Sequence, residues 1–184
     1  MNLLLLTPQD CPQANIAHLT GRRLQHVLEV HQAKIGQKLR VGMVNGLMGE
    51  AEITHLDKQL LQLDFVLNES PPAKLPLTLL LALPRPKMLK RILQTVATMG
   101  VQRLVLMNSY RVEKSFWDSP FLQPDAIQEQ LILGLEQGKD TILPEIILEK
   151  RFKPFVEDRL ASLAGDSLKL VAHPMAQQSC PRDV

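Results

Sequence analysis

Aromatic residues and cysteines are scarce in this sequence, and long apolar runs are missing. Aromatic residues make up 4% of the 184 residues, so we expect an aliphatic core in which leucine dominates. The two cysteines, Cys11 and Cys180, lie far apart, and a disulfide between them is not expected in a cytosolic protein. A membrane-spanning helix needs about 20 apolar residues in succession, and the chain has no such run. The composition therefore indicates a cytosolic globular protein.

Several catalytic and metal-binding motifs are also absent from the sequence. It has no nucleophile elbow, no glycine-rich phosphate loop and no Cys-x-x-Cys pair. His26 and His31 are five residues apart, so they lie on different faces of a helix and do not indicate a metal site. The net charge is only +2, so nucleic-acid binding would depend on local groups of cations rather than on the field of the whole protein.

The segment from Pro76 to Lys114 predicts the centre of the fold. Leu77–Leu83 is an almost continuous aliphatic run, which is typical of a strand buried in a parallel sheet. From Lys87 to Met99, apolar residues recur at helical spacing, and Val101–Met107 is a second aliphatic strand. Two strands joined by a helix in this way run parallel. Ligands of such sheets bind at the carboxyl ends of the strands, so we expect the site at that edge.

The residues before this segment predict a smaller unit of short strands. The expected strands are Asn2–Thr7, Lys38–Val44, Met48–His55 and Gln59–Leu67, with a short helix after Thr20. Asn45-Gly46 is a strong hairpin signal, and several short strands in succession suggest a small antiparallel barrel. Residues 68–75 contain two prolines and no periodicity, so we place a domain boundary near residue 70.

The residues after Lys114 predict two more helices and two more strands. We expect a helix at 124–138, a strand at 143–148, an amphipathic helix at Phe152–Leu163 and a last strand at Leu168–Ala172. The last strand would leave an apolar face open, so we expect a partner chain or the tail Met175–Val184 to cover it. The whole pattern predicts an α/β protein with two domains.

Two groups of cations stand out in the sequence. The first consists of Arg22, Arg23, Lys34, Lys38 and Arg40, in and after the predicted short helix. Such a group is either a solvated surface or a patch that contacts phosphates. The residue types alone leave both interpretations open.

The second group of cations follows the two predicted parallel strands. Arg85, Lys87, Lys90 and Arg91 come after the first strand, and Arg111 comes after the second. Cations at a helix N-terminus are unfavourable because of the helix dipole, unless an anion binds there. We therefore expect an anionic ligand at this edge.

Three aromatic residues and one acid-amide pair have plainer interpretations. Phe116, Trp117 and Phe121 gather in one loop, where packing or an oligomer contact is favoured over base stacking. Glu136-Gln137 lies near a helix end, and the residue types indicate a pair that faces solvent.

Five ordered stretches together resemble one known family. They are LTGRRLQHVLEVHQAKIGQKLRV, LALPRPKMLKRILQTVATMGV, NSYRVEKSFW, LEQGKDTILPE and KRFKPFVEDRL. These stretches resemble the RsmE family of 16S ribosomal RNA uridine-N3 methyltransferases, in the SPOUT (α/β-knot) superfamily, over essentially the whole chain. The resemblance implies a PUA-like RNA-binding β-barrel at residues 1–70. It also implies a SPOUT methyltransferase domain at residues 71–184, with a mostly parallel sheet and helices on both faces.

The resemblance implies partners and site residues as well. The methyl donor would be S-adenosyl-L-methionine, and the substrate would be 16S ribosomal RNA of the small ribosomal subunit. The protein would be a cytoplasmic homodimer without metal or membrane. Arg85, Arg111 and Glu136 are the catalytic candidates, and His173 and Pro174 would line the cofactor pocket unless His173 simply faces water. The RNA-binding candidates are Arg22, Arg23, Lys34, Arg40, Arg85, Lys87, Lys90, Arg91 and Arg111.

The sequence departs from the family in two places. Thr98-Met99-Gly100-Val101 stands where the family has Glu-Leu-Gly-Val. The family also continues with a Gly-Pro-Glu-Gly-Gly loop and a Leu-Gly…Arg…Glu-Thr segment, which form the knot and hold the cofactor, whereas this sequence ends at Val184. We therefore expect an incomplete methyltransferase domain and an inactive chain. The alternatives are a non-catalytic RNA-binding protein that uses the barrel and the basic edge, and a structural or dimerisation module.

Overall fold

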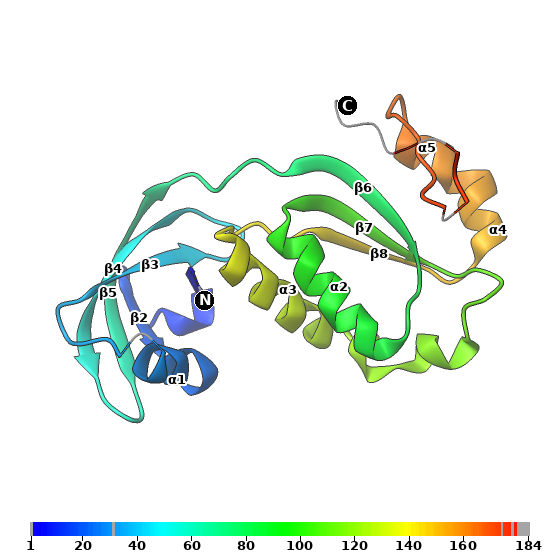
Figure 1. Ribbon diagram of the computed structural model, residues 1–184. Coiled ribbons are helices and arrows are strands. Elements are labelled where there is room, and N and C mark those ends of the chain that lie inside the picture. Colours follow the sequence, from blue (N-terminus) through cyan, green and yellow to red (C-terminus); the bar gives the residue numbers. More distant parts are fainter. Residues whose placement is uncertain (1, 31, 174, 178, 180–184) are drawn as a thin grey trace. The chain divides into compact units, whose positions relative to one another are not determined.

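The computed structural model describes residues 2–30, 32–173, 175–177 and 179 (Figure 1). The chain divides into two compact units, Met1–Lys150 and Arg151–Val184. None of the helices in the described residues is long and apolar enough to cross a membrane.

A curled five-stranded sheet forms the first part of the larger unit. Its strands are β1 (Leu4–Leu6), β2 (Ile16–Leu19), β3 (Lys38–Met43), β4 (Met48–Leu56) and β5 (Leu61–Glu69), in the order β1-β3-β4-β5-β2. All neighbours are antiparallel except β1 and β3, which run parallel. The edge strands β1 and β2 do not pair with each other. The sheet is therefore a half-barrel rather than the antiparallel barrel that the sequence suggested.

Helix α1 (Gly21–Glu29) packs against this half-barrel through an apolar stripe. Leu24 and Val27 of α1 are buried in one core with leucines of β1, β2 and β5. A 3-10 turn (Pro8–Asp10) lies between β1 and β2. Strand β2 was not predicted, because four residues are too few to show a period in the sequence. Its pairing with β5, which places Leu19 opposite Leu61, becomes visible only in the fold.

A parallel three-stranded sheet forms the second part of the larger unit. Its strands β6 (Leu75–Ala82), β7 (Val101–Met107) and β8 (Glu145–Glu149) lie in the order β6-β7-β8. Helix α2 (Pro86–Thr98) connects β6 to β7, and α3 (Pro124–Gly138) precedes β8. The predicted strand-helix-strand unit is confirmed, with bounds that agree within a few residues.

Helices α2 and α3 cover the same face of this sheet (Figure 1). Leu93 of α2 and Leu135 of α3 share one core with Leu104 of β7. The two helices approach so closely that a Cβ atom on Gly138 would lie 2.6 Å from the carbonyl oxygen of Thr98. We predicted helices on both faces, but both described helices of this unit that pack on the sheet lie on one face.

The smaller unit is helical. It contains α4 (Phe152–Pro154), a π-helical segment (Phe155–Arg159) and α5 (Leu160–Ala164), which together cover the predicted amphipathic helix. Residues 168–173 form no strand, and Leu168 and Leu170 are 64% and 57% exposed. The prediction of a covered strand at Leu168–Ala172 is therefore wrong. A strand needs a hydrogen-bonded neighbour, and an aliphatic run does not supply one. Residues 178 and 180–184 of the tail lie outside the described residues.

Candidate functional site

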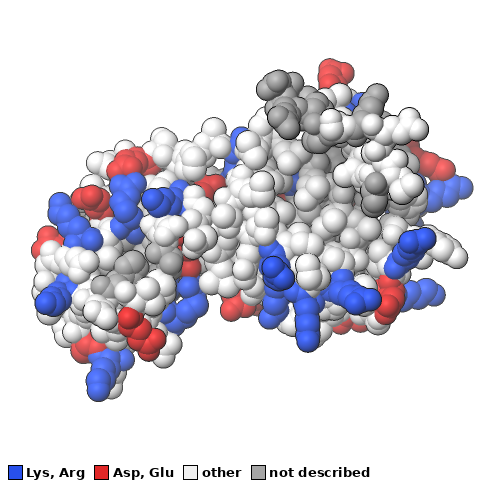
Figure 2. Space-filling view, in the orientation of Figure 1, with Lys and Arg blue, Asp and Glu red and all other residues white. Residues whose placement is uncertain are grey.

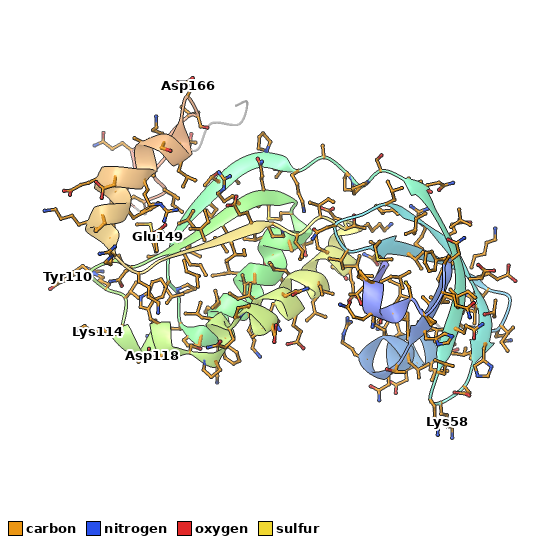
Figure 3. All side chains as sticks on the ribbon, turned by 180° about the vertical axis from the view of Figure 1, so that it is seen from behind. Lys58, Tyr110, Lys114, Asp118, Glu149 and Asp166 are labelled. Carbon is orange, nitrogen blue, oxygen red and sulfur yellow. The ribbon has the colours of Figure 1, made fainter. Side chains whose placement is uncertain are left out.

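The carboxyl ends of β6, β7 and β8 meet at one edge of the parallel sheet. Backbone hydrogen bonds continue just past the strand ends, where the Leu83 N–H donates to the Met107 carbonyl at 2.9 Å and the Asn108 N–H donates to the Glu149 carbonyl at 2.9 Å. Two 3-10 turns, Lys114–Asp118 and Pro120–Leu122, then lead into α3. We call this region the carboxyl edge; Figure 3 labels Tyr110, Lys114, Asp118 and Glu149 there.

Cations gather at the carboxyl edge without acidic partners, and Figure 2 shows lysine and arginine side chains over α2. Arg85 is the N-cap residue of α2, whose first turn contains no acidic residue. Arg85, Lys87, Arg91 and Arg111 are exposed cations of this edge that form no ion pair with a described residue. Lys90 lies over the ring of Phe121, 4.1 Å from its centroid. We call these five cations the edge cluster.

The position of the edge cluster favours an anionic ligand. The start of a helix carries a partial positive charge from its unpaired N–H groups. Adding cations there raises the free energy of the folded protein unless an anion neutralises them. The role of this edge as the binding site stays a prediction.

The first group of cations is arranged differently, because four of its five members are paired with carboxylates. The pairs are Arg22–Glu136 at 2.8 Å, Arg23–Asp10 at 2.6 Å, Lys38–Glu50 at 3.4 Å and Arg40–Glu69 at 2.6 Å. Lys34 is exposed and has no ion pair within the described part of the chain. These charges are largely neutralised inside the protein, so the group presents little free positive charge to a phosphate.

Two of these pairs change the pKa of their carboxyl groups. Burial raises the pKa of Asp10, but hydrogen bonds from Arg23 and Thr7 outweigh burial, so the pKa lies below its ordinary value. The hydrogen bond from Arg40 likewise lowers the pKa of Glu69. Both carboxylates therefore remain ionised around neutral pH, where they hold their arginine partners.

Glu136 is buried, which corrects the interpretation of Glu136-Gln137 as a pair that faces solvent. Its side chain is 2% exposed and accepts two hydrogen bonds from Arg22, at 2.8 and 3.0 Å. Its carbonyl accepts the N–H groups of Asn2 and Leu3, each at 3.0 Å. The partner Arg22 is 114 positions away in the sequence, so no local pattern could have marked this burial.

The three catalytic candidates do not lie together. Helices α2 and α3 run side by side in the same direction, because Gln94 bonds to Gln130 at 2.8 Å and the Thr98 hydroxyl donates to the Gly134 carbonyl at 3.0 Å. Glu136 therefore lies near the C-terminus of α2, whereas Arg85 lies at its N-terminus. Thirteen residues of α-helix span about 20 Å. Arg85 and Arg111 share the carboxyl edge, and Glu136 lies at the opposite end.

Polar contacts at that opposite end join the half-barrel to the parallel sheet. In the turn between β3 and β4, the Asn45 N–H donates to the Thr141 carbonyl at 2.8 Å. The Thr141 hydroxyl in turn donates to the Gly46 carbonyl at 2.6 Å. Lys74 pairs with the buried Asp140 at 2.6 Å. We call these contacts, with the Arg22–Glu136 pair, the joint. The Asn45-Gly46 turn was predicted from the sequence, but its contact with Thr141 was not.

A cavity of about 290 Å³ lies beside the joint. Arg22 and Arg23 line it on one side, and Asp125, Gln128 and Glu129 of α3 line it on the other. Both guanidinium groups are already bound, to Glu136 and Asp10. This cavity therefore offers a phosphate no unpaired arginine.

The loop aromatics pack against the core, as the packing interpretation predicts. Phe116, Trp117 and Phe121 are partly buried on the core of the parallel sheet. The Trp117 ring N–H donates to the Asn108 side-chain oxygen at 3.3 Å. These contacts fix the base of the loop that follows β7.

The residues predicted for the cofactor lie in the smaller unit or outside the described residues. His173 is exposed, and its Nδ1 atom accepts the Met175 N–H at 3.1 Å; Pro174 is not among the described residues. No group of three metal-binding side chains occurs within the described ranges. Cys11 is a free cysteine, and Cys180 lies outside those ranges.

Comparisons with known proteins agree on one family. A family model described as an RNA methyltransferase domain matches residues 71–182. The ribosomal RNA small subunit methyltransferase E of Treponema pallidum is 28% identical over 169 residues, covering 91% of this chain and 63% of the relative. The ribosomal RNA small subunit methyltransferase E 1 of Borreliella burgdorferi is 30% identical over 158 residues, covering 83% and 63%. The chain thus spans 63% of the length of both curated relatives.

Solved structures show the same fold at low identity. A probable rRNA-methyltransferase from Porphyromonas gingivalis has a TM-score of 0.63 and 18% identity, over 84% of this chain and 63% of that one. The ribosomal RNA small subunit methyltransferase E of Neisseria gonorrhoeae, bound to S-adenosyl methionine, has a TM-score of 0.61 and 18% identity, over 80% and 62%. The mixed α/β fold, with a curled half-barrel sheet and a parallel sheet, is therefore shared with these proteins.

Proposed function

Because this chain belongs to the RNA methyltransferase domain family, we propose that it acts in the methylation of ribosomal RNA. The reaction is transfer of a methyl group from S-adenosyl-L-methionine to N3 of a uridine in 16S rRNA. Both curated relatives carry the name of the small-subunit enzyme, and a structure of the same fold has S-adenosyl methionine bound. These names support the proposal, as does the resemblance found in the sequence.

The observation that carries this proposal is the edge cluster. RNA is a polyanion, and unpaired lysine and arginine side chains bind its phosphates. Arg85, Lys87, Arg91 and Arg111 supply such side chains where ligands of parallel sheets bind. Paired cations elsewhere on the protein are already neutralised by carboxylates, so their binding to a phosphate is less favourable.

Arg85 and Arg111 also suit the chemistry at uridine N3. The N3–H group has a pKa well above neutral, and the nitrogen becomes nucleophilic when that proton leaves. A nearby guanidinium stabilises the resulting anion and so lowers the pKa of the group. Glu136 is held by Arg22 about one helix length from this edge, so we assign it to structure rather than to catalysis.

The two residues predicted for the cofactor pocket supply little evidence for it. His173 is exposed, with Nδ1 taken by a backbone N–H, and Pro174 lies outside the described residues. The assignment of His173 and Pro174 to the cofactor pocket therefore stays a prediction.

The domain boundary and the assembly belong to the same proposal. We assign residues 1–70 to a PUA-like RNA-binding domain and residues 71–184 to the methyltransferase domain. A homodimer is supported by β6, an edge strand with Leu75 and Leu77 each 47% exposed, because such an edge favours association. A ribosomal substrate would place the protein in the cytoplasm.

The test is a methyl-transfer assay with the protein expressed from its gene through to the stop codon. Small ribosomal subunits that lack the modification are incubated with tritiated S-adenosyl-L-methionine, and the RNA is digested to nucleosides. We expect label in N3-methyluridine from 16S rRNA. If the protein retains 16S rRNA on a filter but transfers no label to it, the proposed enzymatic activity is wrong. That result would favour a non-catalytic RNA-binding protein. Label in another nucleoside would overturn the assignment of the target atom.

A further inference from the structure

The loop after β7 presents a tyrosine at the tip of a tight turn. The Val112 N–H donates to the Ser109 carbonyl at 3.0 Å, so Tyr110 and Arg111 occupy the two central positions of the turn. Tyr110 is 102% exposed, and Figure 3 shows it at the outer end of the carboxyl edge. Its ring therefore has both faces open to a ligand.

This exposure is exceptional among the aromatic residues of the protein. The chain has five phenylalanines, one tryptophan and one tyrosine, and all seven lie in the described part. After Tyr110, the next most exposed is Phe152, at 47%. The three aromatics nearest in sequence, Phe116, Trp117 and Phe121, pack against the core.

The turn is anchored at its base. The Asn108 N–H is bound to the Glu149 carbonyl at 2.9 Å, and the Asn108 side chain accepts the Trp117 ring N–H at 3.3 Å. Val112 packs against the core of the parallel sheet. A tyrosine side chain has only two rotatable angles, so a ligand that stacks on it loses little conformational entropy. The fold thus anchors the backbone that carries the ring, and the ring itself lies outside the protein.

The neighbours of Tyr110 are suited to a nucleic acid rather than to a protein. Arg111 and Lys114 are exposed and form no ion pair within the described residues, and Glu113 is the one acid of this loop segment. A stable protein interface would bury about 800 Å² on each partner with an apolar centre, and the residues around Tyr110 are polar. Proteins bind unpaired nucleotides by stacking bases on aromatic rings beside cations that hold the phosphates.

We propose that Tyr110 stacks on an unpaired base of the RNA substrate while Arg111 contacts a neighbouring phosphate. This inference rests on the proposed function, because it requires RNA at the carboxyl edge. It adds that the RNA is recognised as a single strand there, by the face of a base. The edge cluster alone would bind any polyanion, and Tyr110 makes the surface selective for one that carries bases.

The experiment compares two oligonucleotides of equal length and charge, a uridine decamer and the same decamer with abasic sites. Affinities of the 184-residue protein are measured by fluorescence anisotropy at fixed salt, for the unmodified chain and for Tyr110→Ala, Tyr110→Leu and Tyr110→Phe. We expect Tyr110→Ala and Tyr110→Leu to weaken binding of the uridine decamer about 5- to 150-fold. Tyr110→Phe keeps the ring and should bind within about twofold of the unmodified chain. The affinity for the abasic decamer should be the same for all variants and the unmodified chain.

A second measurement uses the fact that the chain contains one tyrosine. With ¹³C-labelled tyrosine, the NMR ring signals belong to Tyr110 and need no assignment. The uridine decamer should shift them through its ring current, and the abasic decamer should not. A ring-current shift in the unmodified chain would place the base on Tyr110 itself, which separates lost stacking from a distant effect of the substitutions.

The outcomes separate this inference from the function on which it rests. If both decamers bind equally well and the tyrosine signals stay unchanged, the RNA-binding proposal stands and the stacking role of Tyr110 is wrong. A preference for uridine that survives in Tyr110→Ala would also overturn this role. If neither decamer binds and the chain also fails to retain 16S rRNA, the proposed function itself fails.

Discussion

The two groups of cations differ in what surrounds them, although both looked like RNA-binding candidates in the sequence. In the half-barrel, Arg22, Arg23 and Arg40 each meet a carboxylate within 3 Å. In the edge cluster, Arg85 and Arg111 meet no described acid. The density of positive charge along a sequence therefore does not predict free positive charge on the surface, because tertiary structure decides which cations are paired.

Strand pairing explains part of this difference, whereas Arg22 and Arg23 meet their carboxylates from helix α1. Antiparallel pairing in the half-barrel places Arg40 opposite Glu50 and brings Glu69 of the next strand within reach. At the carboxyl edge, the cations lie on a helix start and on a loop rather than on paired strands. Removing the free cations and removing the paired cations should therefore have different consequences.

The largest effect is expected from the edge cluster. Replacing Arg85, Lys87, Arg91 and Arg111 together by glutamine should weaken binding of a 16S rRNA fragment about 30- to 100-fold at 0.1 M salt. The slope of log affinity against log salt should fall by about 3, because about four phosphate contacts are lost at about 0.7 each. Filter binding over a series of salt concentrations measures both. The matched control, Lys38→Gln with Arg40→Gln, removes paired cations and should change the affinity by less than about threefold. Equal losses in the two variants would contradict the distinction.

The next effect concerns stability at the joint. Arg22→Met leaves the Glu136 carboxylate buried without its partner, which should lower the free energy of unfolding by about 2 kcal/mol. This figure is below the usual range for a broken buried pair, because the Arg22 side chain is 47% exposed. Urea denaturation measures the change. Adding Glu136→Met to the Arg22 variant should restore part of the loss, because the unpaired charge disappears. A double variant less stable than Arg22→Met would show that the ion pair is not the source.

The Asp10–Arg23 pair should contribute to stability in a pH-dependent way. The pKa of Asp10 is lower in the folded protein than its ordinary value of 3.8, so the unfolded chain binds more protons between the two values. The contribution, about 1 kcal/mol, is therefore present above pH 4 and is lost as the pH falls through the folded-state pKa. Asp10→Asn should destabilise the protein at pH 7, and the difference should shrink at lower pH. Thermal unfolding of both proteins between pH 7 and pH 3 would show this, whereas a constant difference would argue against it.

The smallest effect is expected at the exposed Arg40–Glu69 pair. Glu69→Gln should leave the free energy of unfolding almost unchanged, because exposed ion pairs contribute little. The same variant frees Arg40 and so sharpens the comparison of the two groups. We expect RNA affinity to stay within about twofold of the unmodified chain. A clear gain in affinity would mean that the half-barrel lies against the RNA once its cations are free.

The sequence predicted the parallel sheet better than the half-barrel. The aliphatic run at Leu77–Leu83 and the helical spacing from Lys87 to Met99 gave β6 and α2 almost at their observed bounds, because each is long enough to show a period. Strand β2 was not predicted, because its four residues are too few to show a period. The false strand at Leu168–Ala172 has suitable composition but no neighbour to pair with in the described residues.

The placement of the candidate residues was predicted correctly where it followed from the topology and wrongly where it depended on distant partners, and their roles stay predictions. The rule that ligands meet the carboxyl ends of parallel strands placed Arg85 and Arg111 at one edge. Nothing near Glu136 in the sequence indicates that Arg22 will bind it, or that Asn2 and Leu3 will cover its backbone. The exposure of Tyr110 also depends on the tertiary packing of the other aromatics.

The joint has a consequence for how the chain folds during synthesis. Arg22 leaves the ribosome 114 residues before Glu136, an interval of about 6 to 20 s at ordinary rates of translation. During that time the Arg22 side chain stays hydrated, so it carries no desolvation penalty. The Glu136 carboxylate, which is 2% exposed in the folded protein, is synthesised after Arg22 and after the Asn45-Gly46 turn. Because Arg22 is synthesised first, the nascent chain does not bury the Glu136 charge without its partner.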